Sequence, residues 1–247
     1  MSAQPAGASP PARCVLVTGA GRGLGRAMAV HLAAPGTVLF LHYHGSRDGA
    51  RAVQREAEAK GARAVPLSAD LADPASRERL LAEVARQTDA LHVLVNNAGL
   101  YEERGLLETS AADWQRVFDV TCSAVFHLTQ LAVPLLAQGA PARVVNVGDS
   151  GADRVTGRLT ATPYHVAKLG VHVLTRSFAK ALAPRRITVN QISPGFLENS
   201  IGAPGSPIPA GRLGTFADLL PALDFLLSPA AEYTTGANLV VSGGWNL

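Results

Sequence analysis

Charged residues are scarce in this sequence of 247 amino acids. Only 17% of the residues are charged, and 22 basic and 19 acidic side chains leave a formal net charge of +3. A protein that follows a nucleic-acid backbone needs a concentrated basic surface, and here the charges are scattered singly along the chain. The composition therefore argues against nucleic acid as a partner.

Cysteine is rarer still. Cys14 lies in an apolar strand pattern and Cys122 in a helical one, so the two thiols give neither a disulfide framework nor metal-ligand spacing. We expect two inert core thiols, no metal site and a reducing, cytoplasmic environment.

Long hydrophobic runs are missing as well. No run approaches the ~20 apolar residues that span a bilayer, and the opening "MSAQPAGASPPA" has neither the basic nor the apolar region of a signal peptide. We expect residues 1–12 to be disordered, residues 13–247 to form one domain, and no membrane to be a partner.

Short apolar runs alternate with longer helical patterns along the whole chain, and 47% of the residues are hydrophobic. The alternation predicts an α/β protein, a single-domain Rossmann-type doubly wound parallel sheet with helices on both faces. The expected strands are 13–19, 37–43, 62–68, 91–99, 143–148, 187–195 and 238–244, and the expected helices are 23–34, 47–60, 74–88, 112–138, 162–183 and 215–228. Ligands of such sheets bind beyond the carboxyl ends of the strands. The Pro- and Gly-rich residues 198–214 are expected to form a mobile flap over that edge.

A glycine-rich turn, "VTGAGRGLGRAM", follows the first expected strand and opens the first helix. Gly19, Gly23 and Gly25 allow a tight turn whose backbone N–H groups meet a pyrophosphate at the helix N-terminus. Arg22 inside the turn is a candidate for a ribose phosphate, because a guanidinium matches phosphate oxygens. A plain strand-to-helix connection is the alternative interpretation of such a turn.

The second expected strand ends in "HYHGSRD", where an NAD enzyme would place an acid on the ribose hydroxyls. No acid occurs there before Asp48, so NADPH is the expected cofactor, with His44, Ser46 and Arg47 near its phosphate. The alternative is that the arginines are only solvated. Asp70 follows the third expected strand and "NNAG" at 96–99 ends the fourth, so both are expected along the same edge of the sheet. The alternative is that they are ordinary turn residues.

Five motifs together resemble the short-chain dehydrogenase/reductase family: "TGAGRGLG" at 18–25, "NNAG" at 96–99, "YHVAK" at 164–168, "SPG" at 193–195 and "VSGG" at 241–244. The resemblance covers nearly the whole chain. It implies an oxidoreductase that uses a nicotinamide cofactor and assembles as a homotetramer through its fourth and fifth long helices. The expected cofactor-binding residues are Gly19, Arg22, Gly23, Leu24, Gly25, His44, Ser46, Arg47, Asp70, Leu71, Asn97, Ala98, Gly99, Tyr164, Lys168, Pro194 and Gly195.

Tyr164 and Lys168 are the expected catalytic pair. They are four residues apart on an expected helix and so share one face, where the ammonium can lie against the phenol. A nearby cation favours the phenolate, so we expect Lys168 to lower the pKa of Tyr164 and make it a better proton donor to a carbonyl. Only three lysines and four tyrosines occur in the chain, so a chance pairing at this spacing is improbable. The alternative is a half-buried phenol beside a solvated lysine.

Asp149 and Ser150 compete for the position of the serine that polarises the substrate in most of the family. Ser150 fits the count back from Tyr164, whereas Asp149 fits the count from the preceding strand, as in the similar pteridine reductases. Burial fixes register along a strand and loops absorb insertions, so Asp149 is the first choice. The loop before Tyr164 is then about two residues longer than usual. The alternative for Asp149 is a turn residue at the strand end.

One further departure concerns Thr121, which stands where the family commonly has an asparagine that kinks the helix and holds a water of the proton relay. Threonine offers fewer donors. The sequence thus predicts an NADPH-dependent reductase of a C=O or C=N bond in a small molecule, with a pteridine favoured as substrate. A 3-oxoacyl-acyl-carrier-protein reductase or general ketoreductase is the alternative within the enzyme class, and a non-catalytic NADP(H) sensor is the alternative outside it.

Overall fold

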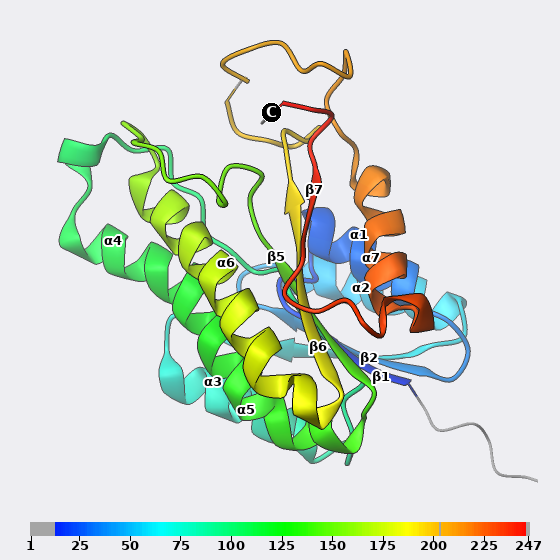
Figure 1. The fold of residues 1–247 in the computed structure, drawn as a ribbon. Coiled ribbons are helices and arrows are strands. Elements are labelled where there is room, and N and C mark those ends of the chain that lie inside the picture. The colour runs from blue at the N-terminus through cyan, green and yellow to red at the C-terminus, as the bar shows by residue number, and fades with distance from the viewer. Residues whose placement is uncertain (1–12, 203, 246–247) are drawn as a thin grey trace, which may run out of the picture.

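The protein is built on one parallel sheet of seven strands in the order β3-β2-β1-β4-β5-β6-β7 (Figure 1). The computed structural model describes residues 13–202 and 204–245, so the predicted disorder of residues 1–12 lies outside the described part. The strands are β1 (Arg13–Val17), β2 (Thr37–Tyr43), β3 (Arg63–Ser68), β4 (Val93–Asn96), β5 (Ala142–Val147), β6 (Ile187–Pro194) and β7 (Asn238–Val241). The order reverses between β1 and β4, so the doubly wound prediction is confirmed.

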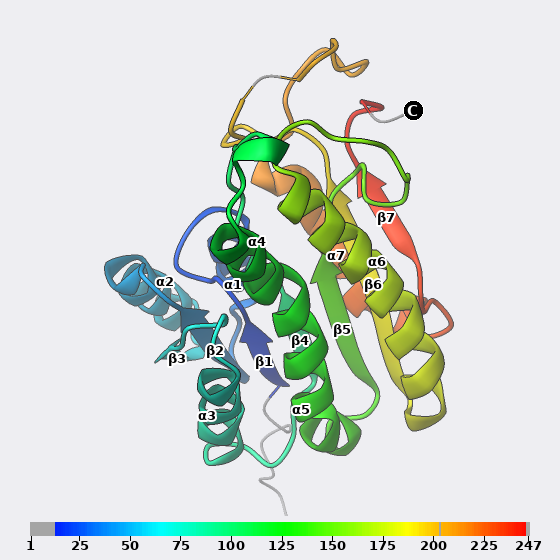
Figure 2. The same cartoon turned by 90° about the vertical axis from the view of Figure 1, so that its left-hand side faces the viewer.

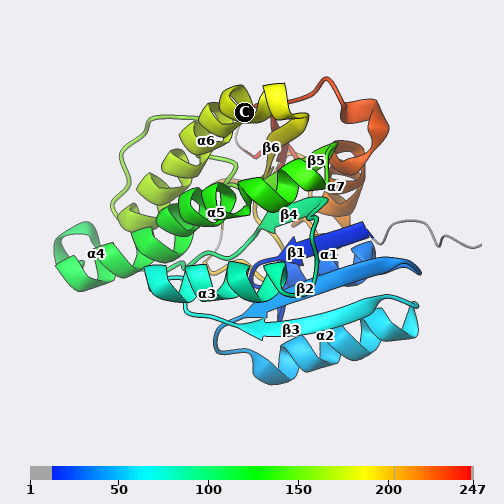
Figure 3. The same ribbon diagram turned by 90° about the horizontal axis from the view of Figure 1, so that it is seen from below.

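Helices cover both faces of the sheet, as Figure 3 shows from below. α1 (Gly23–Leu32), α2 (Arg47–Ala59) and α7 (Leu220–Leu227) lie on one face, and α3 (Pro74–Ala85), α5 (Ala124–Gln138) and α6 (Thr162–Leu182) lie on the other. The remaining helical pieces are α4 (Ala111–Phe118), η1 (Leu106–Glu108), η2 (Asp119–Ser123), η3 (Ala183–Arg185), η4 (Phe216–Leu219) and η5 (Pro229–Ala231).

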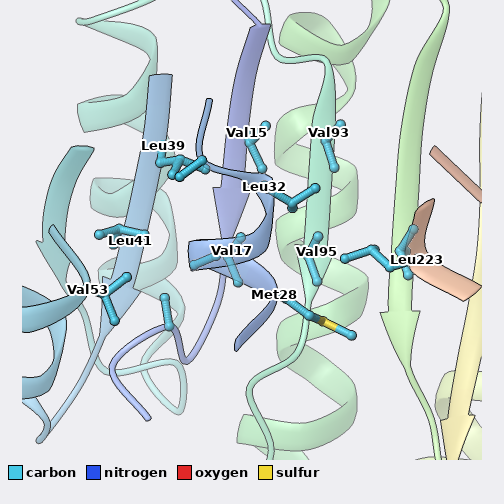
Figure 4. Close-up of a cluster of buried hydrophobic side chains, with 14 of the residues drawn as sticks. Val15, Val17, Met28, Leu32, Leu39, Leu41, Val53, Val93, Val95 and Leu223 are labelled. Carbon is cyan, nitrogen blue, oxygen red and sulfur yellow. The ribbon is translucent and has the colours of Figure 1, made fainter. Parts of the chain in front are cut away.

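The hydrophobic core is divided by the sheet into two layers, because successive strand residues point to opposite faces. Val15 and Val17 join the layer under α1, α2 and α7, which Figure 4 shows with Met28 and Leu223. Leu16 joins the layer under α3 and α5. Each fully buried aliphatic side chain contributes about 1.5–3 kcal/mol. The two layers fix the positions of the strands, and the site lies at the carboxyl ends of these strands.

The helix expected at 112–138 is observed as one continuous helix that includes a π-helical turn. α4, η2 and α5 run together over Ala111–Gln138, and η2 carries Thr121 and Cys122. With a hydropathy of 1.6, this helix is long and apolar enough to cross a membrane by length and composition. Polar residues interrupt it, so it contains no continuous apolar run of the kind discussed above. Part of its apolar surface packs on α3, α6 and the sheet (Figure 2).

A long segment after β6 rises above the carboxyl ends of the strands. Its base is closed by a parallel bridge between Leu197 and Gly214. Arg212 donates to both Asp218 carboxylate oxygens at 2.7 Å, a bidentate pair that fixes the returning chain at the start of η4. The two ends of the segment expected to form the flap, residues 198–214, are therefore held next to each other.

Candidate active site

The glycine turn between β1 and α1 has the backbone that its sequence predicts. Gly19 and Gly23 have φ values of +65° and +56°, in the region that favours glycine. A Cβ atom at Gly25 would collide with the carbonyl oxygen of Gly19. The start of α1 thus comes close to the preceding strand, and its free N–H groups face the cavity above β1.

Thr18 and Asn97 hold this turn against the end of β4. The Asn97 amide donates to the Thr18 carbonyl at 2.8 Å, and the Thr18 hydroxyl accepts the backbone N–H groups of Asn97 and Ala98, each at 2.9 Å. Sequence reasoning did not assign Thr18 a role. The signal available was a hydroxyl next to the first glycine, at the end of a buried strand.

His42 at the end of β2 is a second support that sequence reasoning did not assign. Its Nδ1 accepts the Gly19 N–H at 3.1 Å, and its Nε2 donates to the Ala69 carbonyl at 3.1 Å. Burial lowers the pKa of His42 to about 4, with the hydrogen bond to Ala69 opposing the shift. The imidazole is therefore neutral at physiological pH, which the acceptor role of Nδ1 requires.

A cavity of about 770 Å³ opens above the glycine turn. It brings together most of the expected cofactor residues: Gly19, Arg22, Gly23, Leu24, Gly25, His44, Ser46, Asp70, Leu71, Asn97, Ala98 and Gly99. Arg47 was also expected here, but the structure does not bring it to the lining. It is the first residue of α2 and is exposed, and Gly45 and Ser46 form the wall instead.

The end of β2 fits a phosphorylated ribose better than a ribose with free hydroxyls. His44, Gly45 and Ser46 line the cavity there and Arg22 lines it from the glycine turn, so no carboxylate occupies this strand end within the described residues. His44 lies 3.8 Å from Asp70, which follows β3. The donors and the cation present thus suit the phosphate of NADPH.

A second cavity of about 600 Å³ adjoins the first and contains the expected catalytic pair. The Lys168 ammonium lies 5.5 Å from the centre of the Tyr164 ring and donates to the Val147 carbonyl at 2.5 Å. Lys168 is only 3% exposed, so it is not a solvated surface lysine. Burial lowers the pKa of Lys168 to about 8, while the charge of Asp149 raises it. Pro194 and Gly195 line the same cavity.

The pKa of Tyr164 moves in the opposite direction from the one predicted. Burial raises it first, and the charges of Asp149 and Tyr101 raise it further. The expectation considered only Lys168, whereas desolvation of the phenol and a nearby carboxylate both disfavour the phenolate. Tyr164 is therefore a neutral phenol at physiological pH, and its hydroxyl proton is available for donation.

Asp149 and Ser150 both line the second cavity, and they are held differently. An Asp149 carboxylate oxygen accepts the Gly151 N–H at 2.9 Å, and the Asp149 charge acts on both Tyr164 and Lys168. Ser150 is buried, and its backbone N–H donates to the Pro194 carbonyl at 3.0 Å. The structure thus brings the Asp149 carboxylate into the electrostatic environment of the catalytic pair.

Thr121 lies on the π-helical turn, directly behind the loop that follows β4. Its hydroxyl accepts the Leu100 N–H at 3.1 Å, and the residue is fully buried. The helix is therefore irregular here without the usual asparagine, because one extra residue in the turn re-aims the backbone. Thr121 positions the segment that carries Gly99 into both cavities.

Aromatic side chains form two sides of the second cavity. The rings of Tyr101 and Tyr164 meet edge to face at 5.1 Å, and those of Phe196 and Trp245 do so at 4.8 Å. Arg158 reaches the lining from the loop between β5 and α6. Sequence reasoning gave Arg158 no role, since a loop residue carries no periodicity. Among the described residues no cluster of histidine, cysteine or carboxylate side chains could hold a metal ion.

Comparison with known proteins agrees with this arrangement. Residues 19–246 match the family model described as enoyl-(acyl carrier protein) reductase. The chain is 34% identical over 241 residues to the 3-oxoacyl-[acyl-carrier-protein] reductase FabG of Staphylococcus aureus, covering 94% of this chain and 97% of that protein. The relatives found in this comparison give a pteridine substrate no support.

Solved structures superpose along almost the full length. A short-chain dehydrogenase from Burkholderia cenocepacia in complex with NADP matches with a TM-score of 0.87 and 30% identity, covering 96% of this chain and 99% of that chain. A blue fluorescent protein from a metagenomic library, in complex with NADPH, matches with a TM-score of 0.88 and 31% identity over the same shares. Both structures contain the cofactor that the end of β2 predicts, as NADP or NADPH. The chain is an oxidoreductase and belongs to the short-chain dehydrogenase/reductase family.

Proposed function

We propose that this protein is an NADPH-dependent reductase that acts on a C=O or C=N bond of a small molecule. The observation that carries the proposal is the Tyr164–Lys168 pair in a cavity that adjoins the glycine turn. NADPH, when bound, supplies the hydride. The Tyr164 hydroxyl gives the proton to the oxygen or nitrogen of the reduced bond, and Lys168 stabilises the phenolate that this transfer leaves behind. A sensor without turnover needs neither group.

The preference for NADPH rests on Arg22 in the glycine turn and on His44 and Ser46 after β2, which all line the cofactor cavity. A guanidinium interacts more strongly with a phosphate than with a neutral ribose hydroxyl. Glycine N–H groups at the start of α1 suit the pyrophosphate. Asn97 and Thr18 keep the turn in the conformation that presents them.

Asp149 favours a C=N bond in a flat heterocycle, such as a dihydropteridine, as the substrate. A carboxyl beside the proton donor can hold or relay a proton at a ring nitrogen, which a serine hydroxyl does less well. The aromatic side chains of Tyr101 and Trp245 in the cavity lining suit a planar ring. This choice of substrate depends on the residues of the cavity alone.

Reduction of a 3-oxoacyl thioester is the second candidate, and similarity to FabG over nearly the whole chain favours it. In this candidate Ser150 polarises the ketone and Asp149 serves as a turn residue. The buried position of Ser150 weighs against it, although Ser150 also lines the cavity.

The test is NADPH oxidation with dihydrobiopterin, with an acetoacetyl thioester and without substrate. For the dihydropteridine we expect Asp149→Ala to lower kcat/KM at least tenfold, Ser150→Ala to have little effect, and Tyr164→Phe to lower kcat by about 10²–10⁴. If only the thioester is reduced and only Ser150→Ala matters, the second candidate replaces the first. Unchanged turnover in Tyr164→Phe would contradict both.

We also propose a homotetramer in the cytoplasm. Exposed apolar side chains on the outer surface of α5 and α6 support assembly through these helices: Phe126, Leu131, Val166 and Val173. A second copy of the chain would cover them with the same surface, as two-fold symmetry requires. Cys14 and Cys122 are both buried thiols, which suits a reducing compartment.

A further inference from the structure

Arg158 is a cation in the substrate cavity that the proposed chemistry does not use. It lies on the loop between β5 and α6, is half-buried, and lines the cavity with Asp149, Tyr164 and His165. Its guanidinium makes no ion pair with any described residue. A half-buried guanidinium without a carboxylate partner in a cavity is a donor available to a ligand.

The backbone around Arg158 is fixed although the side chain is free. The Arg158 carbonyl accepts the Thr162 hydroxyl at 3.0 Å, and the Leu159 carbonyl accepts the Leu106 N–H at 2.9 Å. Thr160 forms an antiparallel bridge with Gly105. The end of this long loop is therefore anchored to the segment after β4, and it presents the guanidinium from a fixed position.

The guanidinium and the Asp149 carboxylate lie side by side. A Cβ atom built on Gly151 would be 2.9 Å from Nη2 of Arg158 and 3.3 Å from Oδ1 of Asp149, so both groups lie within 3.3 Å of one point. They are nevertheless too far apart for an ion pair. The cavity thus offers a hydrogen-bond donor next to an acceptor, each with capacity left for a ligand.

The charges of the cavity decide which ligand chemistry fits this arrangement. Asp149 and Glu103 both line it, so an anionic ligand at Arg158 would be repelled by a neighbouring carboxylate. A neutral group that presents a carbonyl oxygen next to an N–H satisfies both Arg158 and Asp149 without that cost. A cyclic amide has this pattern because its amide bond is cis and holds the carbonyl oxygen and the N–H on the same edge, whereas a trans amide turns them to opposite sides.

We propose that Arg158 and Asp149 together recognise an amide edge of the substrate, with Arg158 donating to its carbonyl oxygen and Asp149 accepting its N–H. This inference rests on the proposed function, because it places the amide beside the bond that Tyr164 protonates. The cyclic amide of a pteridine ring presents such an edge, whereas the open-chain amides of a pantetheine arm are trans and do not. Arg158 is then the specificity-determining residue of the cavity.

The test is calorimetric binding to the NADP⁺-loaded enzyme, which needs no turnover and so separates this inference from the proposed reaction. Pterin, pantetheine and acetoacetate are the probes for a cyclic amide, an open-chain amide and a carboxylate. Arg158→Met removes the donor. Arg154→Met is the matched control, because Arg154 is an exposed residue of the same loop that does not line the cavity.

We expect Arg158→Met to raise the Kd of pterin at least tenfold, Asp149→Leu to do the same, and Arg154→Met to leave it unchanged. Pantetheine serves as the open-chain control, and we expect Arg158→Met to leave its Kd unchanged. Four results would overturn the inference: selective weakening of pantetheine, weakening of acetoacetate alone, no difference between Arg158→Met and Arg154→Met, or no binding of pterin to the wild type.

Discussion

At the scale of the residue, the substrate cavity is governed by charges in a poorly solvated space. Tyr164 is half-buried at the cavity wall, and its pKa is raised by desolvation first and then by Asp149 and Tyr101. Lys168 is buried, and burial pulls its pKa down to about 8. At neutral pH Tyr164 is therefore protonated, whereas Lys168 loses its proton near pH 8. The protonation state of the pair thus depends on pH through Lys168.

This sensitivity predicts a falling limb in the pH profile. Lysine is charged below its pKa, so kcat/KM should decrease as the pH rises through about 8 and Lys168 loses its proton. In Lys168→Arg the guanidinium stays charged, and the limb should move above pH 9 even if the rate is lower. Asp149→Asn removes a charge that raises the Lys168 pKa, so the limb should move to lower pH. Steady-state rates between pH 6 and 10 measure all three profiles, and three superimposable limbs would rule Lys168 out.

At the scale of the element, the site depends on how separate strands are tied together at their carboxyl ends. Strand and helix ranges could be predicted from the sequence because strands buried on both faces are short continuous apolar runs, whereas the covering helices have a 3.6-residue apolar period, and β2 was predicted to the residue. The position of Arg158 could not be predicted, since the loop of residues 148–161 has no such period. The place of Arg47 relative to the cavity could not be predicted for a related reason: the sequence shows that α2 begins there but not which side of its first turn faces the cavity.

His42 shows how one side chain joins three such elements, and it predicts an acid-sensitive stability. The folded protein holds a neutral imidazole with a pKa of about 4, whereas the unfolded chain has an ordinary value of 6.5. Between pH 6.5 and pH 4 the unfolded state therefore binds more protons than the folded state. The contribution of His42 to the free energy of unfolding is complete above pH 6.5 and is lost as the pH falls to 4. The loss is about 3 kcal/mol at most.

Urea unfolding of the wild type and of His42→Gln at pH 7, 5.5 and 4.5 measures this contribution. A glutamine oxygen can still accept the Gly19 N–H, but it does not titrate. We expect the free energy of unfolding of the wild type to decrease relative to that of His42→Gln as the pH falls. Parallel curves would mean that His42 does not carry the effect and that other histidines do.

At the scale of the whole molecule, one face of the sheet is covered by a helix pair whose outer surface remains apolar. α5 and α6 bury one side against the sheet, and their rings of Phe126 and Phe178 lie 5.9 Å apart across the two helices. Val173 is 55% exposed on the outside. The apolar composition of Ala111–Gln138 therefore serves two surfaces, one inside the protomer and one that the proposed homotetramer would bury.

A charge on this surface should break the assembly without unfolding the protomer. Because a two-fold interface brings each residue close to its symmetry mate or a neighbouring surface, Val173→Glu buries an unpaired carboxylate from each protomer, at a cost of several kcal/mol per contact. We expect light scattering to give the mass of four chains for the wild type and of a smaller species for the variant, with an unchanged circular dichroism spectrum. Arg55→Glu, which adds a carboxylate to the exposed side of α2 across the sheet, should stay tetrameric. A tetramer that survives both changes would place the interface elsewhere, and α5 and α6 would then need another explanation for their exposed apolar side chains.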